Sequence, residues 1–381
     1  MPHGYTGYYF IRSDKDIKRR IMDSQSQEKM RINIILPGSG TTGGTIVVWN
    51  YVREFRKRGI DVIVYAPLIA YNLHRADMIH NVGKQVKASG RAIRDRKKYQ
   101  EIEWVPLICD LMIRDADYTI ATAWPTAYDV SRLSDRKGKK IYFIQGYEVW
   151  DDEKRGKQSY LLPLHKIVIS SWIRDQIREH VGPMKMPVVY NGMDSDFFRN
   201  EERCYDKKGE PLTVLMLNHS LKNKGVEYGL QAWQMVKKNY PELKLVMFGQ
   251  LSRKNLPEEI EYHESPSQEE IRDLYCNADI FLFPSLAEGW GLTPLEAMAC
   301  RCPVAGTRTG FVLDIGKDYE NMLISEPGDI EGLAENLEKL VSDGELRKTL
   351  GENGRKLVQQ LSWERSADLL LKCMRGKEKR A

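Results

Sequence analysis

The sequence has little that would bind a metal ion or build a disulfide framework. Its six cysteines, in a chain of 381 residues, form no Cys-x-x-Cys pair and are not accompanied by histidines at ligand spacing. Zinc sites and disulfide-rich folds need such patterns, so neither is expected here. We interpret the cysteines as reduced, mostly buried thiols of a cytoplasmic protein.

Long apolar runs are also missing. No stretch approaches the roughly 18 consecutive apolar residues that a membrane-spanning helix needs. The first twenty residues are polar and lack the apolar core of a secretory signal, so we expect residues 1–30 to be an N-terminal extension outside the fold. With 42% apolar and 29% charged residues, the composition is that of a folded protein with about two or three domains.

Charge is divided unevenly along the chain. Residues 1–200 carry 33 Lys and Arg against 23 Asp and Glu, whereas residues 201–381 carry 25 against 30. Two interpretations of the densest basic stretch, residues 83–100, remain open. It is either a solvated surface, or it contacts a phosphate-bearing acceptor or the anionic inner face of a membrane. Nucleic acid is not an expected partner, because aromatic residues are not interleaved with these charges.

Strand and helix patterns alternate twice along the chain. The first series begins with an apolar strand pattern at 31–38, and the second begins after a polar, turn-rich stretch at 191–211 that we interpret as a linker. Such alternation predicts mostly parallel sheets with helices on both faces. The expected fold is therefore α/β, with two Rossmann-like doubly wound domains, residues 31–195 and 196–359, facing a central cleft.

The glycine-rich stretch after the first strand fits G-x-G-x-x-G, but its context argues against a dinucleotide site. Such a site needs an acidic residue at the end of the second strand, where this chain has Tyr65-Ala66-Pro67. Gly43 is followed by Gly44 rather than by lysine, which excludes a nucleotide triphosphatase loop. We expect the backbone at Gly43 and Gly44 to approach an anionic ligand at a helix N-terminus. A tight turn without a ligand is the alternative.

The most informative segment is SLAEGWGLTPLEAMACRCPV, residues 285–304. Glu288 falls in a glycine-rich turn after a strand pattern, and Glu296 falls eight positions later in the first turns of a helix pattern. The turn Gly289-Trp290-Gly291 would expose N–H groups at that helix N-terminus, which suits a phosphate. The two carboxylates can accept hydrogen bonds from the vicinal hydroxyls of a sugar and of a ribose.

This segment resembles the retaining glycosyltransferases of the GT-B fold, family 4 type (glycosyl transferases group 1). Their E-x7-E motif matches the chain from Glu288 to Glu296. The resemblance extends over most of residues 31–370 and includes NGMDSDFF at 191–198. YFIQGYE at 142–148 is similar to a stretch in members that build polysaccharides, rhamnosyltransferases among them.

The resemblance implies a nucleotide-diphosphate sugar held mainly by the second domain, and a helix at 360–381 that crosses back to complete the first. Glu288 would meet the sugar hydroxyls near the reacting centre, and Glu296 would accept from the ribose hydroxyls. The catalytic residues that the resemblance implies are Glu288, Lys224 and His219. Further contacts with the donor are expected from Gly43, Gly44, Gly249, Gly289, Trp290, Gly291, Leu292 and Thr293.

The chain departs from the family at one basic position. The family's Arg-x4-Lys pair follows the first strand of the second domain, and here His219 stands in the Arg place while Lys224 keeps the Lys place. Arg holds a diphosphate as a fixed two-pronged cation, whereas neutral His donates one hydrogen bond. Either His219 is charged when the diphosphate is bound, or Lys222 or another cation contributes. A histidine that is merely packed at a strand end also remains open.

The acceptor side is expected at the strand ends of the first domain. Trp124 stands where many relatives carry a histidine, and it either stacks on a sugar or packs in the core. Gln145, Tyr147 and Glu148 follow another strand and are expected to line the acceptor side. The acidic run at 151–153 is interpreted as a helix start rather than a metal site.

The predicted reaction moves a hexosyl or deoxyhexosyl group to an acceptor hydroxyl of a glycan or lipid-linked glycan, with retention and without a metal or other cofactor. Lys224, His219 and helix-terminal N–H groups would stabilise the charge that develops on the diphosphate. Closure about the linker would exclude water. A non-catalytic protein that binds a nucleotide sugar or glycan, and a sugar-nucleotide epimerase or a phosphorylase on the same architecture, are the alternatives.

Overall fold

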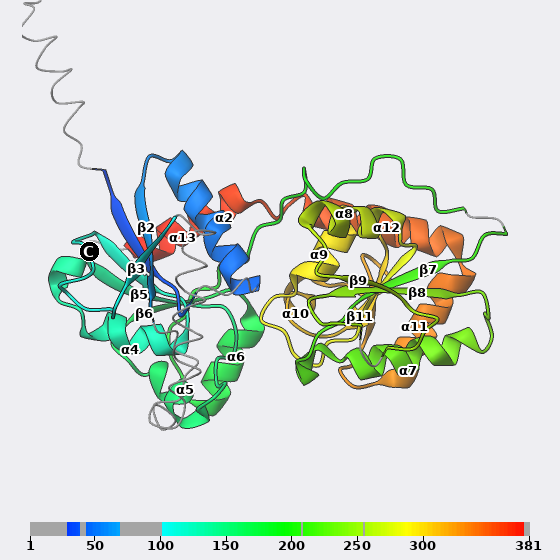
Figure 1. The fold of residues 1–381 in the computed structure, drawn as a ribbon, viewed down its shortest axis with the longest axis horizontal. Coiled ribbons are helices and arrows are strands. Elements are labelled where there is room, and N and C mark those ends of the chain that lie inside the picture. The colour runs from blue at the N-terminus through cyan, green and yellow to red at the C-terminus, as the bar shows by residue number, and fades with distance from the viewer. Residues whose placement is uncertain (1–28, 39–42, 69–100, 207–208, 254–255, 377–381) are drawn as a thin grey trace, which may run out of the picture.

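The chain folds into two α/β domains that lie side by side (Figure 1). This computed structural model describes residues 29–38, 43–68, 101–206, 209–253 and 256–376, so the basic stretch at 83–100 and the extension at 1–28 lie outside the described residues. None of the described helices is both long and apolar enough to cross a bilayer. All six cysteines are free thiols.

Six parallel strands form the sheet of the first domain, in the order β3-β2-β1-β4-β5-β6. The central strand β1 is apolar, and its isoleucines are buried because helices cover both faces of the sheet. The strand order reverses between β1 and β4, and ligands of such sheets bind beyond the carboxyl ends of the strands at this point. The strands are β1 (Arg31–Ile35), β2 (Asp61–Pro67), β3 (Ile102–Val105), β4 (Tyr118–Ala121), β5 (Lys139–Ile144) and β6 (His165–Val168).

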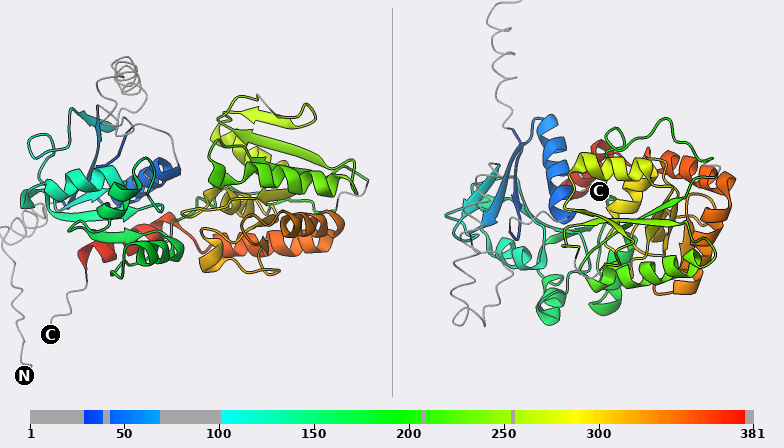
Figure 2. Two further views of the ribbon diagram at one scale, coloured as in Figure 1. Left: turned by 90° about the horizontal axis from the view of Figure 1, so that it is seen from below. Right: turned by 45° about the vertical axis from the view of Figure 1, so that its right-hand side comes forward.

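The last helix of the chain packs on the first domain, as Figures 1 and 2 show. This helix, α13 (Trp363–Arg375), lies against α2, where the Trp363 ring meets Tyr51 edge-on at 5.4 Å. At its other end, the carbonyl oxygen of Cys373 lies 3.0 Å from Nε2 of His165. The other helices of this domain are α2 (Gly43–Lys57), α4 (Trp124–Arg132), α5 (Glu153–Ser159) and α6 (Ser171–His180).

The second sheet repeats the plan of the first, in the order β12-β11-β10-β7-β8-β9 and with parallel pairing throughout. Its order reverses between β7 and β10, where Met216 pairs in register with Leu282. The carboxyl ends of these two strands are therefore the expected ligand edge. The strands are β7 (Thr213–Leu217), β8 (Lys244–Gly249), β9 (Glu261–Glu264), β10 (Ile280–Phe283), β11 (Val304–Thr307) and β12 (Leu323–Ser325).

Three of the described helices of the second domain begin at residues whose side chains cap them. Ser267 caps α8 by accepting a hydrogen bond from the Glu270 N–H, and the Glu270 side chain bonds back to the Ser267 N–H. In the first domain, Asp152 caps α5 by accepting a hydrogen bond from the Arg155 N–H, so the acidic run at 151–153 does start a helix. The second domain contains α7 (Val226–Lys237), α8 (Gln268–Asn277), α9 (Leu292–Ala299), α10 (Val312–Ile315), α11 (Ile330–Ser342) and α12 (Gly344–Val358).

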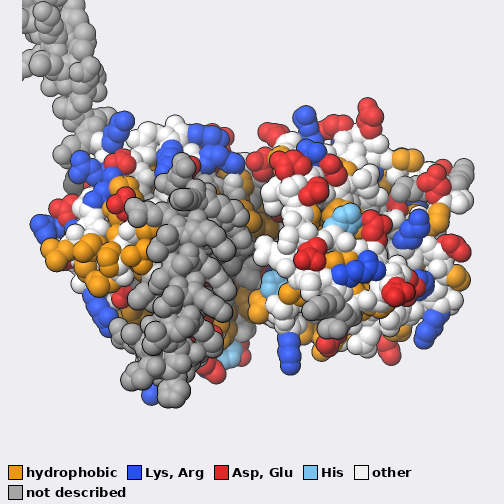
Figure 3. All heavy atoms as spheres, viewed as in Figure 1, with side chains coloured by type: hydrophobic (Ala, Val, Ile, Leu, Met, Phe, Trp, Pro, Cys, Tyr) orange, Lys and Arg blue, Asp and Glu red, His pale blue; other side chains and the backbone are white. Residues whose placement is uncertain are grey.

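Acidic and basic side chains are interspersed over the visible face of the second domain (Figure 3). The net negative balance of this half of the sequence is therefore not gathered into one acidic patch on that face. An interspersed surface gives weak long-range steering of a charged partner.

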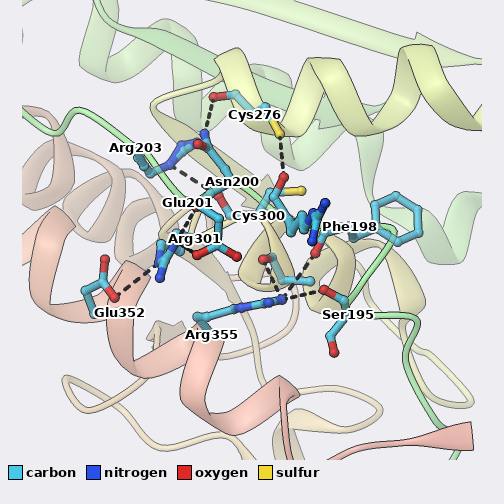
Figure 4. Close-up of polar contacts among 12 residues, drawn as sticks. Ser195, Phe198, Asn200, Glu201, Arg203, Cys276, Cys300, Arg301, Glu352 and Arg355 are labelled. Carbon is cyan, nitrogen blue, oxygen red and sulfur yellow. Dashed lines mark hydrogen bonds and ion pairs between the residues drawn. The ribbon is translucent and has the colours of Figure 1, made fainter.

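Three arginines fasten the expected linker to the second domain (Figure 4). Arg203 donates to the carbonyl oxygens of Tyr275 and Ala278, each at 2.9 Å. Arg355 donates to the carbonyl oxygen of Ser195 at 2.8 Å, and Arg301 bonds to that of Asn200. The linker is therefore not free along its whole length, because its middle part is bound to the second domain.

The two chain crossings between the domains lie beside each other. The Met193 N–H donates to the Leu361 carbonyl oxygen at 2.8 Å. A Cβ on Gly192 would lie 2.3 Å from the backbone nitrogen of Trp363, so this contact requires glycine. A rotation of one domain relative to the other would have to bend the chain here, where the two connections between the domains lie side by side.

Candidate active site

Lys224 and Glu288 meet at the ligand edge of the second sheet. Lys224 follows β7 and Glu288 follows β10, the two strands between which the order reverses. The Lys224 ammonium lies 2.7 and 2.9 Å from the two carboxylate oxygens of Glu288. The hydroxyl of Ser285 donates to the same carboxylate at 2.9 Å. The Glu288 side chain is 10% exposed, so the pair is partly shielded from water.

A tight turn places Lys224 opposite Glu288. Residues 222–224 form a single 3-10 turn that ends at Gly225, which has a φ of +63°. A Cβ on Gly225 would lie 2.0 Å from the carbonyl oxygen of Pro284. The Leu286 N–H also donates to the Asn223 carbonyl oxygen at 2.7 Å. The turn after β7 is therefore packed directly on the loop that carries Glu288.

The His219 ring is bonded to the backbone of this turn. Its Nδ1 accepts a hydrogen bond of 3.0 Å from the Leu221 N–H. Burial, followed by the positive charge of Lys224, lowers the pKa of His219. The charged form is therefore disfavoured before a ligand binds, and the ring offers one donor, Nε2–H. Lys222 lies exposed in the same turn.

The N-terminus of α9 follows directly after Glu288. Gly291 has a φ of +92° and precedes Leu292 and Thr293, whose N–H groups begin the helix. The Trp290 side chain is 3% exposed and stacks on Tyr190 at 5.0 Å. The Trp290 carbonyl oxygen accepts a hydrogen bond of 2.7 Å from the Phe311 N–H, so a contact between the Trp290 backbone and a donor stays a prediction.

Glu296 lies in the second turn of α9 and faces α8. The hydroxyl of Tyr275 donates to Glu296 Oε2 at 2.9 Å. Burial raises the pKa of Glu296 to about 7. This carboxyl group is therefore sensitive to pH close to neutrality, unlike an ordinary exposed glutamate.

Gly249 ends β8 in a crowded place. A Cβ there would lie 2.2 Å from the Asn218 carbonyl oxygen. Backbone packing alone thus requires glycine at this position, and its contact with a donor stays a prediction.

Gln145 lies where the glycine segments of the two domains meet. Gly43 and Gly44 open α2, as expected, and a Cβ on Gly44 would lie 3.4 Å from Gln145 Oε1. A Cβ on Gly289 would lie 2.1 Å from the Gln145 carbonyl oxygen. The structure therefore brings together three predicted residues: Gly44 at the start of α2, Gln145 after β5 and Gly289 after β10. Residues 39–42 lie outside the described residues.

Trp124 and Glu148 lie inside the first domain instead of at its surface. Trp124 is 6% exposed, and its Nε1–H donates to the Trp150 carbonyl oxygen at 3.1 Å. Glu148 is also 6% exposed and accepts a hydrogen bond of 2.8 Å from the Tyr142 hydroxyl. Burial raises the pKa of Glu148 to about 7. The interpretation of Trp124 as a core residue therefore fits the structure. The buried Glu148 carboxylate accepts hydrogen bonds from Tyr142 and from the Gln145 N–H, and so stabilises the loop after β5.

Tyr147 is half-buried, with its ring stacked on Tyr160 at 6.2 Å and tilted against His180 at 5.4 Å. These contacts fix the ring within the first domain. A contact between Tyr147 and an acceptor stays a prediction.

Sequence reasoning missed three residues that support the site. Ser285 and Tyr275 bond to the two predicted glutamates. Asp314 of α10 accepts a hydrogen bond of 2.9 Å from the Ser171 N–H at the start of α6, and so joins the two domains. No spacing rule reveals the contacts of Tyr275 and Asp314, because each joins separate helices, whereas Ser285 and Glu288 lie three positions apart in one loop.

Comparisons with known proteins find a likeness over the part of the chain that carries this geometry. Residues 197–357 match the family model described as Glycosyl transferases group 1. The matched residues make up most of the second domain. The Glu288–Lys224 pair and the α9 N-terminus both lie within the group 1 domain.

Curated relatives extend the likeness beyond this domain. The chain is 30% identical over 220 residues to an uncharacterised glycosyltransferase of Methanocaldococcus jannaschii, which is 56% of this chain and 58% of the relative. It is 27% identical over 215 residues to CapM of Staphylococcus aureus, a capsular polysaccharide biosynthesis glycosyltransferase, which is 52% of this chain and 57% of CapM. The chain thus spans a little over half the length of these two relatives.

The architecture matches solved structures over nearly the whole chain. HepE of Anabaena, solved in complex with UDP, superposes with a TM-score of 0.71, covering 90% of this chain and 98% of HepE at 13% identity. At this identity the likeness shows the fold alone. The expected GT-B architecture of two Rossmann-like domains is confirmed.

Proposed function

We propose that this protein is a glycosyltransferase that moves a sugar from a nucleotide-diphosphate sugar to an acceptor hydroxyl. The observation that carries the proposal is the Lys224–Glu288 pair beside the N-terminus of α9, within a group 1 domain. A cation and unpaired helix N–H groups at one place suit a diphosphate, and a carboxylate beside them suits sugar hydroxyls. The names of the curated relatives support the same activity.

In the proposed complex, each residue acts on one part of the donor. Glu296 accepts hydrogen bonds from the ribose hydroxyls, and Glu288 accepts them from the sugar. The N–H groups of Leu292 and Thr293 face the diphosphate. Lys224, which Glu288 holds in place, stabilises the negative charge on that diphosphate as it leaves.

The proposed step exchanges one carbon–oxygen bond for another. The bond from the anomeric carbon to the diphosphate oxygen breaks, and its electron pair stays on the diphosphate. The acceptor oxygen bonds to the same carbon, which has oxocarbenium character in the transition state. The acceptor proton passes to a diphosphate oxygen, so the acceptor enters on the face that the leaving group vacates and the product retains its configuration.

The acceptor is proposed to be a glycan or lipid-linked glycan, in keeping with the likeness to CapM. Transfer is proposed to need no metal ion, because Lys224 and the helix N–H groups supply the electrostatic stabilisation. Transfer that continues after chelation of divalent cations supports this part of the proposal, and transfer abolished by chelation contradicts it.

One observation favours a second candidate, a non-catalytic protein that binds a nucleotide sugar. His219 replaces the arginine expected from the resemblance and is neutral, so this site has one cation fewer than that pattern. A weaker electrostatic environment would lower catalysis more than binding, because charge develops on the diphosphate in the transition state. Turnover of the donor separates the two candidates.

Binding is tested by thermal-shift titration with UDP, GDP, dTDP and ADP. We expect one diphosphate to stabilise the wild-type protein, and we expect Glu296→Gln to lose most of this response because an amide oxygen is a weaker acceptor than a carboxylate. If none of the four diphosphates stabilises the wild type, the proposed donor site is wrong.

A further inference from the structure

Tyr275 is enclosed by aromatic rings near the end of α8. The rings of Phe198, Phe248 and Phe281 pack edge-on around it, with centroids at 6.1, 5.8 and 5.4 Å. Its hydroxyl is the one polar part of the side chain, and it donates to Glu296 Oε2 at 2.9 Å. Among the described residues, no other group bonds to this carboxylate. The tyrosine is thus held rigidly and bonds to a single oxygen.

We propose that Tyr275 is a positioning residue of the donor site, whose hydroxyl holds Oε2 of Glu296 and leaves Oε1 directed to the ribose. This inference rests on the proposed function, in which Glu296 accepts hydrogen bonds from the ribose. A carboxylate that is fixed before the ligand arrives loses less rotational freedom on binding, which increases affinity. The aromatic enclosure of Tyr275 transmits that rigidity from the core of the second domain to the site.

The hydroxyl also affects the charge of Glu296. Burial disfavours the ionised carboxylate and raises its pKa to about 7, whereas the hydrogen bond from Tyr275 favours the ionised form. Burial keeps Tyr275 protonated, so it remains a donor. Cys300, after α9, and Cys302, before β11, face Tyr275, and Arg203 of the linker faces these thiols. Tyr275 is the titratable group that contacts Glu296 directly.

A direction of pH dependence follows. The ribose hydroxyls donate to the ionised carboxylate, so affinity for the nucleotide should rise as the pH increases through the pKa of Glu296. Loss of the Tyr275 hydroxyl should raise that pKa further. The affinity profile of Tyr275→Phe should therefore shift to higher pH, and a purely structural defect would lower affinity equally at every pH.

The experiment is calorimetric titration of whichever of UDP, GDP, dTDP and ADP stabilises the wild type, from about pH 6 to about pH 9. For Tyr275→Phe we expect about tenfold weaker binding near pH 7, in line with the loss of a hydrogen bond to a charged group, and partial recovery near pH 9. The affinity of the variant is divided by that of the wild type at each pH, because protonation of the diphosphate itself affects both equally and cancels in this ratio.

Tyr142→Phe is the matched control. Tyr142 is also buried, and its hydroxyl also donates to a buried glutamate whose pKa is raised to about 7, but this pair lies in the first domain. The Tyr142→Phe variant should bind the diphosphate with the same affinity as the wild type. Glu296→Gln is a second variant that leaves α8 untouched; it should bind much more weakly, and the affinity that it retains should lack the pH dependence attributed to Glu296.

Each outcome decides one claim. If the wild type binds none of the four diphosphates, the proposed function fails, and this inference fails with it. If the wild type binds and Glu296→Gln does not, but Tyr275→Phe keeps both the affinity and the pH profile, the role of Tyr275 alone is overturned. A loss in Tyr275→Phe that is the same at every pH also overturns it, because it indicates packing only.

Discussion

Lys224 is a cation that is already paired before a donor arrives. Its ammonium group contacts both oxygens of Glu288, and the nearby His219 offers a neutral N–H. A diphosphate must therefore share Lys224 with Glu288. Since the pair is only partly shielded from water, its Coulomb energy is modest and the exchange is feasible.

Restoring an arginine at position 219 should strengthen binding of the diphosphate. Arg adds a permanent charge and several donors, so His219→Arg should bind the diphosphate about tenfold more tightly at low salt, with a smaller gain at high salt. Calorimetry with the diphosphate and with its parent nucleoside checks this. Lys222→Arg is the control, since it changes no charge on the same turn. Equal affinity of the two variants would show that position 219 does not face the diphosphate.

The sequence was informative about individual residues only where a motif or a family position existed. It predicted Glu288 and Lys224, which the structure joins in an ion pair. It did not predict Tyr275, because a contact between two helices depends on their packing. It placed Glu148 on the acceptor side, which stays a prediction, but it did not indicate that this side chain is buried, because glutamate is usually exposed.

At the scale of elements, the turn between β7 and α7 sets the distance between Lys224 and Glu288. Gly225 combines a left-handed φ with close approach to the Pro284 carbonyl oxygen. Gly59, after α2, has a similar φ of +72° but open space around it. Comparing substitutions at Gly225 and at Gly59 therefore separates the effect of backbone strain from that of steric overlap.

Gly225→Ala should therefore destabilise the protein more than Gly59→Ala. Strain alone costs about 1–2 kcal/mol for a non-glycine residue in this region, and overlap with the Pro284 carbonyl adds to it in Gly225→Ala. Chemical denaturation measures the free energy of unfolding of both variants. Donor binding should weaken only in Gly225→Ala. Equal destabilisation of the two variants would mean that the turn relaxes without cost.

The elements that the sequence predicted best are the apolar central strands. β1 and β10 are short apolar runs, as buried parallel strands must be. β9 was missed because it is a polar strand at the edge of the sheet, with Glu261 and Glu264 exposed. α12 was missed too, although Asp343 caps it, because its charged residues obscure the apolar stripe.

At the scale of the whole molecule, the two domains touch at the site itself. Tyr190 stacks on Trp290, Gln145 contacts Gly289, and Asp314 caps α6 from the opposite domain. A carboxylate at a helix N-terminus is stabilised by the unpaired N–H groups there. These contacts hold the domains in the arrangement seen here.

Asp314→Ala should loosen this arrangement. Loss of the cap should cost about 1 kcal/mol of stability, and small-angle scattering should show a larger radius of gyration. Ser170→Ala removes a cap of the same helix within the first domain, where Ser170 accepts from the Ile173 N–H. It should lower stability similarly and leave the radius unchanged. An unchanged radius in Asp314→Ala would contradict a role in holding the domains together.

The measurement that tests the central claim most directly is donor turnover. Nucleoside diphosphate released from UDP-, GDP-, dTDP- and ADP-sugars in the presence of added glycan and lipid-linked glycan acceptors is followed by mass spectrometry, for wild type, Lys224→Met and the control Lys222→Met. We predict that wild type and Lys222→Met turn over one class of donor, and that Lys224→Met is at least about 100-fold slower because a charge that stabilises the leaving group is lost. No turnover by the wild type, or undiminished turnover by Lys224→Met, would contradict the account.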